Sequence, residues 1–200
     1  MRLVKANDMR EMDRITIQEI GIPGAVLMEN AARGASRCFL EHFNPPQGAM
    51  IIFLCGPGNN GGDGYVIARY LHEKGFNVIV LLLAQRENIK GDALLNLNII
   101  QKIGIDIIDT SSLEKWNMVK DQLNKADYIV DAILGTGLNS PVRDFFAIII
   151  DDVNRAEKPV MAVDIPSGLN ADNGQVMGRA IRADLTVTFG FPKLGQIIFP

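Results

Sequence analysis

The stretch that decides the fold is residues 50–64, MIIFLCGPGNNGGDG. Its first part is apolar on both alternating faces, which is typical of a strand covered by helices on both sides of a sheet. Gly56, Gly58 and Gly61 then satisfy the spacing G-x-G-x-x-G, and a segment of helix length follows. Glycines let a backbone approach a ligand, and amide groups at a helix N-terminus suit a phosphate. The stretch therefore predicts a strand, a ligand-binding turn and a helix in that order.

The rest of the chain repeats this alternation of short apolar runs and amphipathic segments. Repeated β-α-β units with right-handed crossovers give a mainly parallel sheet. We therefore expect an α/β fold, a Rossmann-like three-layer α/β/α sandwich, whose ligands bind beyond the carboxyl ends of the strands near a switch in strand order. Strands are predicted at residues 50–55, 77–83, 105–108, 128–134, 160–165 and 185–189, and helices at residues 64–74, 89–103, 112–124 and 144–156.

Two further helices are expected before the sheet. Asp8 and Glu11 have the spacing of a capping box, so the first helix should begin at Asp8 and end at Gly21. Pro23 stands near the start of the second helix, and residues 44–48, NPPQG, separate it from the first strand. Because no repeat or low-complexity tract divides the chain, we interpret residues 1–200 as a single domain.

Composition excludes several classes of partner. The 200 residues hold 20 Lys and Arg against 23 Asp and Glu, a formal net charge of −3, with no basic block. This balance gives no electrostatic footprint for nucleic acid or an anionic membrane. No apolar run approaches the roughly 20 residues of a membrane span, and the polar N-terminus lacks the apolar core of a secretory signal, so we expect a cytoplasmic protein. Cys38 and Cys55 are interpreted as small apolar residues.

The glycine-rich loop differs from an ordinary dinucleotide site. The acidic residue expected after the second strand is replaced by Ala84-Gln85-Arg86, which argues against standard NAD binding, although Arg86 would tolerate a ribose phosphate. Asp63 is either the N-cap of the following helix or a ligand contact, and both interpretations stay open. The loop also lacks the Gly-Lys-Ser/Thr of a P-loop, which weakens an ATPase interpretation.

Three more loops carry polar groups after strands. Asp131 and Asp164 each follow a buried strand, and although either could be a turn former, two carboxylates at the ligand-binding edge favour a site. Lys193 is either solvated or part of that site. His42 and His72 lie on helices away from these loops, so Ser167 has no base for a catalytic triad.

The available metal ligands are oxygen atoms. The chain has no His/Cys cluster for zinc, which leaves donors such as Asn60, Asp131 and Ser167. Oxygen donors alone suit a hard cation. A large monovalent ion can be satisfied by neutral oxygens and a single charge, which favours potassium over a divalent ion.

Several motifs in a fixed order resemble the NAD(P)H-hydrate epimerase family, the YjeF N-terminal domain. They are MREMD, GIPGAVLMENAARGA, GPGNNGGDG, VDAILGTGL, VDIPSGLNADNGQ and TFGFPKLG, and they cover nearly the whole chain. The resemblance implies an isomerase that interconverts the R and S forms of hydrated NADH and NADPH (NADHX and NADPHX) at C6 of the nicotinamide ring. This is metabolite repair, because a stereospecific dehydratase can then act on both forms.

The resemblance also implies the residues of the site. It implies one potassium ion per subunit, held by Asn60, Asp131 and Ser167. It implies substrate contacts at Asn59, Asn60, Gly61, Gly62, Asp63, Gly135, Thr136, Gly137, Leu138, Asn139, Ser140, Pro141 and Asp164, to which we add Lys193. Asp164 is the candidate catalytic acid/base, because it is a carboxylate at a strand end beside small residues.

Some alternatives remain open at the level of sequence. Family domains usually continue beyond position 200, so the chain is compatible with a fragment of a longer bifunctional protein that carries the dehydratase. A homodimer is also compatible with the resemblance. A non-catalytic nucleotide-binding or partner-binding module of the same fold and an ordinary NAD(P)-dependent oxidoreductase are the competing functions.

Overall fold

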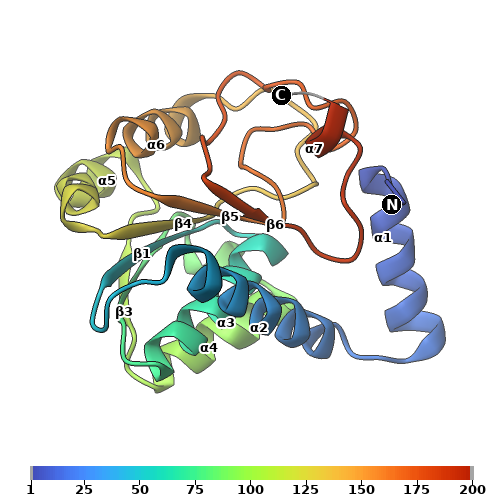
Figure 1. Ribbon diagram of the computed structural model, residues 1–200, viewed down its shortest axis with the longest axis horizontal. Helices are drawn as coiled ribbons and strands as arrows, with labels where there is room; N and C mark the ends of the chain where they lie inside the picture. Colours follow the sequence, from blue (N-terminus) through green and yellow to red (C-terminus); the bar gives the residue numbers. More distant parts are fainter. Residues whose placement is uncertain (1, 199–200) are drawn as a thin grey trace.

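The computed structural model of the protein describes residues 2–198, and its centre is one parallel six-stranded sheet (Figure 1). The strands lie in the order β3-β2-β1-β4-β5-β6, and every neighbouring pair is parallel. This confirms the expected Rossmann-like α/β sandwich. The strands are β1 (Met50–Cys55), β2 (Asn77–Leu82), β3 (Asp106–Asp109), β4 (Tyr128–Ala132), β5 (Val160–Val163) and β6 (Leu185–Val187).

Helices cover both faces of the sheet. Helices α2, α3 and α4 pack on one face and α5 and α6 on the other, as Figure 1 shows. Along β1 the side chains alternate between these layers, with Ile51 and Phe53 in the first core and Ile52 and Leu54 in the second. The helices are α1 (Ala6–Arg14), α2 (Gly24–Phe43), α3 (Asn59–Glu73), α4 (Gly91–Lys102), α5 (Leu113–Val119), α6 (Asp144–Arg155) and α7 (Gly195–Ile198). Shorter helical segments are the π-helix η1 (Ile15–Ile20) and the 3-10 helices η2 (Arg86–Asn88) and η3 (Lys120–Lys125).

The strand order changes direction between β1 and β4. The chain adds β2 and β3 on one side of β1 and then returns to place β4 on the other side. Leu54 of β1 is level with Asp131 of β4, and the amide of Gly56 donates to the carbonyl oxygen of Ala132 at 3.0 Å. The loops after β1 and β4 therefore leave the sheet side by side at the switch point, where this fold class binds ligands.

Helix α3 begins at Asn59 rather than near residue 64, so the expected long glycine loop is wrong. Gly58 is the N-cap, and Asp63 lies inside the helix, which excludes the N-cap role considered for it. The glycines serve close packing. A Cβ on Gly61 would lie 2.1 Å from the carbonyl oxygen of Gly56, and one on Gly56 would lie 2.0 Å from that of Ile133. Packing of the helix start onto the strand ends overrides the low helix propensity of glycine.

Three predicted strands end two residues earlier than expected, and β2 ends one residue earlier, at Leu82. Strands β4, β5 and β6 stop at Ala132, Val163 and Val187, before the polar residues of their loops. The predicted helix at residues 112–124 is divided into α5 and the 3-10 segment η3. Apolar residues such as Ile133 and Ile165 extend the sequence pattern past the strand ends because they remain buried in the turns.

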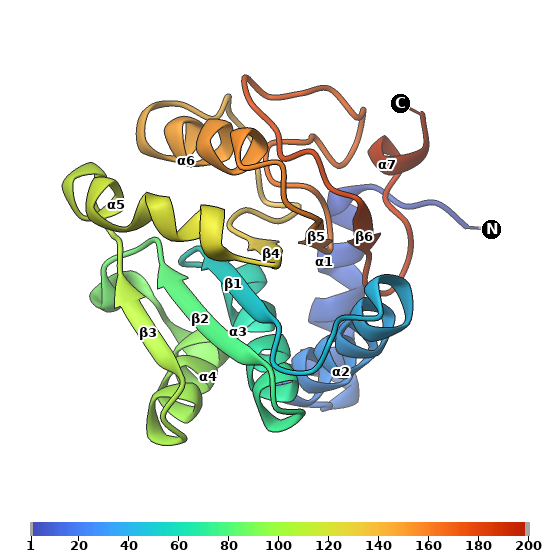
Figure 2. The same ribbon diagram turned by 60° about the vertical axis from the view of Figure 1, so that its left-hand side comes forward.

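The N-terminal segment lies beyond the carboxyl ends of the strands, where α1 is visible in Figures 1 and 2. Val4 forms an isolated parallel bridge with Lys193, in which the amide of Val4 donates to Pro192 and that of Leu194 donates to Val4. Helix α1 begins at Ala6, so the predicted start at Asp8 is wrong. Asp8 instead accepts from the amide of the N-cap, Lys5, at 3.0 Å.

The helical path of the N-terminal segment continues through η1 to Gly21, as expected. Gly21 has a left-handed φ of 89° and caps η1. No helix in residues 2–198 combines the length and apolar character that a membrane crossing requires.

The packing of Gly61 predicts a large effect of a single methyl group. Gly61→Ala places Cβ against a backbone oxygen that has no room to move, so we expect it to lower the free energy of unfolding by about 2 kcal/mol. Gly34→Ala on α2 is the matched control, since its Cβ meets no atom within 4 Å and should be neutral or slightly stabilising. Urea denaturation measures both variants, and equal stabilities would contradict the close approach.

Candidate active site

The most deeply buried carboxylate of the site is Asp131, the fourth residue of β4. It is fully buried, and its Oδ1 accepts from the hydroxyl of Ser167 at 2.6 Å and the amide of Ile133 at 3.2 Å. Its Oδ2 accepts from the amide of Ser167 at 2.8 Å. Burial raises the pKa of Asp131 to about 6, against the opposing effect of these hydrogen bonds. No lysine or arginine in residues 2–198 offsets this carboxylate.

Asn60 contributes an unused polar atom beside the loop that follows β4. Its side chain packs against Gly135 in the loop after β4, where a Cβ would lie 3.3 Å from the Cβ of Asn60. The terminal nitrogen of its amide is buried and has no hydrogen-bond partner within the described part of the chain. A half-turn of the amide places its oxygen in the same position.

These residues fit a monovalent cation. A buried carboxylate without a counter-charge and an amide with an orphaned terminal atom are both satisfied by a positive ion with oxygen ligands. The hydroxyl of Ser167 also accepts from the amide of Leu134 at 2.8 Å, so Ser167 already joins the two loops. Residues 2–198 contain no cluster of three or more His, Cys, Asp or Glu side chains that would hold a metal ion.

Asp164 follows β5 in a strained backbone conformation. Its φ is +65°, and the amide of Ile165 donates back to the carbonyl oxygen of Val163 at 2.8 Å, the hydrogen bond of a γ-turn. A positive φ is uncommon for a residue with a side chain, and it persists only where surrounding contacts impose it. The amide of Asp164 is held by the carbonyl oxygen of Val187 at 2.8 Å.

Lys193 is the counter-charge of Asp164. Its ammonium group donates to Asp164 Oδ1, to the hydroxyl of Thr188 at 2.9 Å and to the carbonyl oxygen of Phe189 at 3.0 Å. Lys193 is only 1% exposed, so the solvated interpretation is wrong. An ammonium has three donors, and all three are occupied by groups of the chain, so Lys193 holds Asp164. A substrate contact of Lys193 stays a prediction.

The two carboxylate oxygens of Asp164 have different surroundings. Oδ1 accepts from Lys193, from Thr188 at 3.2 Å and from the amide of Phe189 at 3.0 Å. Oδ2 accepts no hydrogen bond from residues 2–198, and the side chain is 16% exposed. The protein therefore holds one oxygen and leaves the other available to a bound molecule.

Two further carboxylates face this ion pair. Asp63 on α3 is half-buried, and burial together with the negative charge of Asp164 raises its pKa well above the ordinary value. Asp13 on α1 has a raised pKa because of partial loss of water contact and the charge of Asp164. The N-terminal helix thus brings a charged group to the site, and Asp63 favours its protonated form more strongly than a solvated aspartate does.

The other predicted substrate residues lie around the same sheet edge. Asn59, Asn60, Gly61 and Gly62 form the first turn of α3, where backbone amides point away from the helix. The loop at residues 135–141 joins β4 to α6 and is largely exposed, with Leu138 packed against the core. No hydrogen bond in the described chain links residues 136–141 to Asp164, so this loop is adjacent to the site without being fixed to it.

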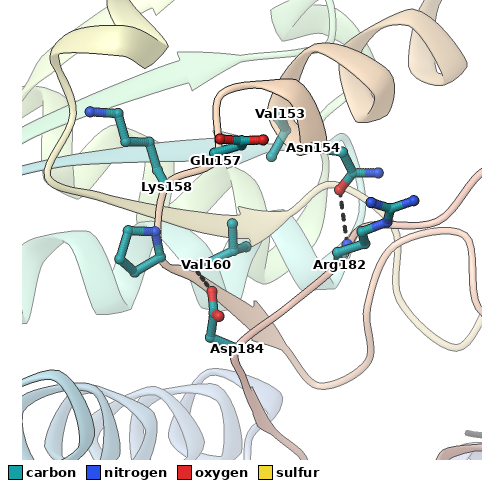
Figure 3. Close-up of a pocket in the computed structure, with 8 residues that line it drawn as sticks. Val153, Asn154, Glu157, Lys158, Val160, Arg182 and Asp184 are labelled. Atoms are coloured by element: carbon teal, nitrogen blue, oxygen red, sulfur yellow. Dashed lines mark hydrogen bonds between the residues drawn. The ribbon is translucent and has the colours of Figure 1, made fainter.

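A separate surface pocket of about 360 Å³ lies at the opposite, amino end of β5 (Figure 3). Its polar groups are used by the fold. Asp184 accepts from the amide of Val160 at 2.8 Å, and the Asn154 side-chain oxygen accepts from the amide of Arg182 at 2.9 Å, as the dashed lines of Figure 3 show. This pocket contains none of the predicted site residues, and we do not assign it to the reaction.

The arrangement defines a class of protein: a Rossmann-like α/β protein with a polar site at the switch in strand order. Comparisons with known proteins identify the family within that class. A family model described as "YjeF-related protein N-terminus" matches residues 24–195. The chain belongs to this family.

Curated relatives agree with this assignment, and a solved structure shares the fold. The chain is 43% identical to "Bifunctional NAD(P)H-hydrate repair enzyme Nnr" of Moorella thermoacetica, matching 100% of this chain but 38% of that protein. It is 40% identical to "NAD(P)H-hydrate epimerase" of Limosilactobacillus fermentum, over 97% of this chain and 88% of the relative. The crystal structure of yeast ynu0 has the same fold, with a TM-score of 0.87 and 24% identity over 100% of this chain and 85% of that one. The chain thus spans well under half of the bifunctional relatives and most of the single-function ones.

Sequence reasoning missed two residues that the structure brings to the site. Asp13 belongs to the motif MREMD, but no local pattern predicts that α1 lies beside the carboxyl ends of the strands. Gln196 follows the last motif, and its side chain donates to the carbonyl oxygen of Asp164 at 2.8 Å. The bridge between Val4 and Lys193 is a long-range pairing that no local pattern reports.

The raised pKa of Asp63 predicts how stability depends on pH. The ordinary pKa is 3.8, and the folded protein keeps the proton to higher pH. The folded state therefore binds more protons in this window, and the free energy of unfolding falls as the pH rises through it. Asp63→Asn cannot ionise, so its stability should fall less between about pH 4 and about pH 7.

Urea denaturation at the two pH values measures this difference. The control is Asp151→Asn, because Asp151 makes an ion pair on the surface with Arg179 and should retain the wild-type slope. Equal slopes for wild type and Asp63→Asn would contradict the electrostatic environment described for Asp63.

Proposed function

We propose that the protein is an isomerase that interconverts the R and S forms of NADHX and NADPHX at C6 of the nicotinamide ring. The observation that carries this proposal is the carboxylate of Asp164, which is held through Oδ1 and open at Oδ2 beyond the carboxyl ends of the strands. The names of two kinds of relative support the proposal. One kind is called "NAD(P)H-hydrate epimerase", and the other is called "Bifunctional NAD(P)H-hydrate repair enzyme".

The reaction requires one group that moves a proton at the C6 hydroxyl. C6 is a hemiaminal carbon, so two routes make it planar. In one, a supplied proton lets the hydroxyl leave as water, pushed by the electron pair of the ring nitrogen; water then adds to either face of C6 and returns the proton. In the other, the hydroxyl proton moves to the ring nitrogen as the C6–N bond breaks to leave a carbonyl group, and the nitrogen adds back to either face. Neither route needs a redox step. Oδ2 of Asp164 is the group we assign to this transfer, and the buried Lys193 fixes the position of the carboxyl group.

The rest of the substrate is assigned to the start of α3 and the neighbouring loop. Helix α3 runs from Asn59 to Glu73, and its first amides offer donors to a diphosphate group. We propose contacts from Asn59 to Asp63 and from residues 135–141, as the family resemblance implies. Asp63, protonated more readily than an ordinary aspartate, would donate a hydrogen bond to the uncharged end of the substrate.

We also propose that one potassium ion per subunit binds Asn60, Asp131 and Ser167. The support is the buried carboxylate without a protein counter-charge and the orphaned amide atom of Asn60. When bound, the ion supplies a fixed positive charge beside the loops that follow β1, β4 and β5. Asp131 then stays ionised and holds the amide and hydroxyl of Ser167.

The biological setting follows from the chemistry of the substrate. We propose that the protein works with a dehydratase that consumes one epimer, either as a separate protein or within one chain, as the name "Bifunctional NAD(P)H-hydrate repair enzyme" suggests for relatives. We place the reaction in the cytoplasm, where NADH and NADPH are used, and we propose a homodimer. Analytical ultracentrifugation tests the dimer.

Replacing Asp164 tests the proposed activity. Asp164→Asn keeps the size of the side chain but removes the proton-transfer group, so turnover should fall by about 10²- to 10⁴-fold while binding of NADP is retained. Incubation of one pure epimer, followed by chromatography that resolves the other, measures the rate. Asp151→Asn on the surface should match wild type. A wild-type rate no faster than the spontaneous one would favour the binding-module alternative.

Exchange of salt tests the potassium site. Binding to the native state alone raises stability, so the melting temperature should be about 5 °C higher in potassium chloride than in lithium or tetramethylammonium chloride at equal ionic strength. Asn60→Ala and Asp131→Asn should each lose this difference. Equal melting temperatures of the wild-type protein in the three salts would refute the ion while leaving the epimerase proposal in place.

A further inference from the structure

One side-chain amide joins both partners of the buried ion pair. Gln196 lies in α7, the short helix that follows Lys193. Its Nε2 donates to the main-chain carbonyl oxygen of Asp164 at 2.8 Å, and its Oε1 accepts from the main-chain amide of Lys193 at 2.8 Å. Both functional ends of the Gln196 amide are therefore used, one on each member of the pair.

The hydrogen bond from Gln196 satisfies the main-chain carbonyl oxygen of Asp164, which lies outside the sheet. In the turn at Asp164 the chain has left β5, and its φ of +65° directs the peptide group away from the strand ladder. The amide of Asp164 is satisfied by Val187, whereas its carbonyl oxygen is satisfied by Gln196. A strained conformation of this kind relaxes unless neighbouring groups hold both sides of the peptide.

The helix that carries Gln196 is itself fixed to the body of the protein. The amide of Gly195 donates to the carbonyl oxygen of Ala171 at 2.7 Å. A Cβ on Gly195 would lie 2.2 Å from the carbonyl oxygen of Asn170, so α7 sits directly on the turn that contains these residues. The side-chain amide of Gln196 thus links α7, which is packed on the turn at residues 170–171, to both residues of the ion pair.

We propose that Gln196 is a positioning residue of the reaction. It fixes the main chain of Asp164 relative to the main chain of Lys193, so that Oδ2 of Asp164 faces the substrate. The inference rests on the proposed epimerase function and assigns a residue one position beyond the part of the chain that the family model matches. Gln196 acts through Asp164 and Lys193 and does not itself touch the reacting atoms.

Loss of the two hydrogen bonds of Gln196 should lower kcat more than it raises KM. A misplacement of a catalytic group by about 1 Å can cost 10²-fold in rate. For Gln196→Met, which keeps the length of the side chain and removes both hydrogen bonds, we expect kcat to fall by about 10- to 100-fold. KM should stay within about threefold of wild type, because the substrate-binding turn of α3 and the loop at residues 135–141 are untouched.

Three variants separate positioning from simple stability. Gln196→Glu keeps an acceptor for the amide of Lys193 but places an oxygen against the carbonyl oxygen of Asp164, so its kcat should also fall. Ile197→Met, on the same helix and 52% exposed in the native protein, is the matched control and should keep the wild-type kcat. Melting temperatures show whether each variant is folded at the assay temperature.

The second readout is the carbon NMR signal of the Asp164 carboxyl group, assigned with Asp164→Asn. The charged groups that face Asp164 are Lys193 in the loop after β6, Asp63 on α3 and Asp13 on α1. Gln196→Met should move this signal and change the pH-rate profile, and Ile197→Met should change neither.

The outcomes distinguish the two proposals. A folded Gln196→Met protein with wild-type kcat and an unchanged Asp164 carboxyl signal would overturn the positioning role. A lower melting temperature alone, with both readouts unchanged in the folded protein, would overturn it equally. If wild type shows no epimerisation, the proposed function fails, while the NMR signal still decides whether Gln196 sets the environment of Asp164.

Discussion

Burial of the Lys193 ammonium is the constraint on which the site depends. An ammonium removed from water costs several kcal/mol unless an opposite charge and hydrogen-bond acceptors replace the water. Here the carboxylate of Asp164 and two oxygens of the chain after β6 replace it. The loops that leave β5 and β6 must therefore converge on one atom, Nζ of Lys193. Asp164, at the start of one of these loops, has a left-handed φ of +65°, and its side chain stays 16% exposed.

A second constraint is close contact between main-chain segments, at positions where only glycine fits. Gly56 meets the chain after β4, and Gly61 meets Gly56, which seats the first turn of α3 at the switch point. Gly168 has a φ of +95°, and a Cβ there would lie 1.8 Å from the carbonyl oxygen of Arg179. This contact fixes the residue next to Ser167, whose amide and hydroxyl bind Asp131. Glycine thus shapes both halves of the site through packing.

The sequence predicted those parts of the molecule that depend on local patterns. Runs that are apolar on both faces predicted the six strands, which the structure confirms. The start of α3 was missed because glycine disfavours a helix unless packing requires it. The burial of Lys193 was missed because lysine is usually exposed and its counter-charge, Asp164, is remote in sequence. Asp13 and Gln196 were missed for the same reason, since each reaches the site through a tertiary contact.

The two aspartates at the strand ends differ in how their charge is balanced. Asp164 has its counter-ion within the protein, and its Oδ1 is held by Lys193 while its Oδ2 accepts no hydrogen bond from residues 2–198. Asp131 is buried more deeply. It accepts hydrogen bonds, but no lysine or arginine in residues 2–198 pairs with it. Hydrogen bonds orient a carboxylate without cancelling its charge, so Asp131 needs either a proton or a cation that the chain does not supply. The same residue type, once within β4 and once directly after β5, therefore has its charge balanced in two different ways.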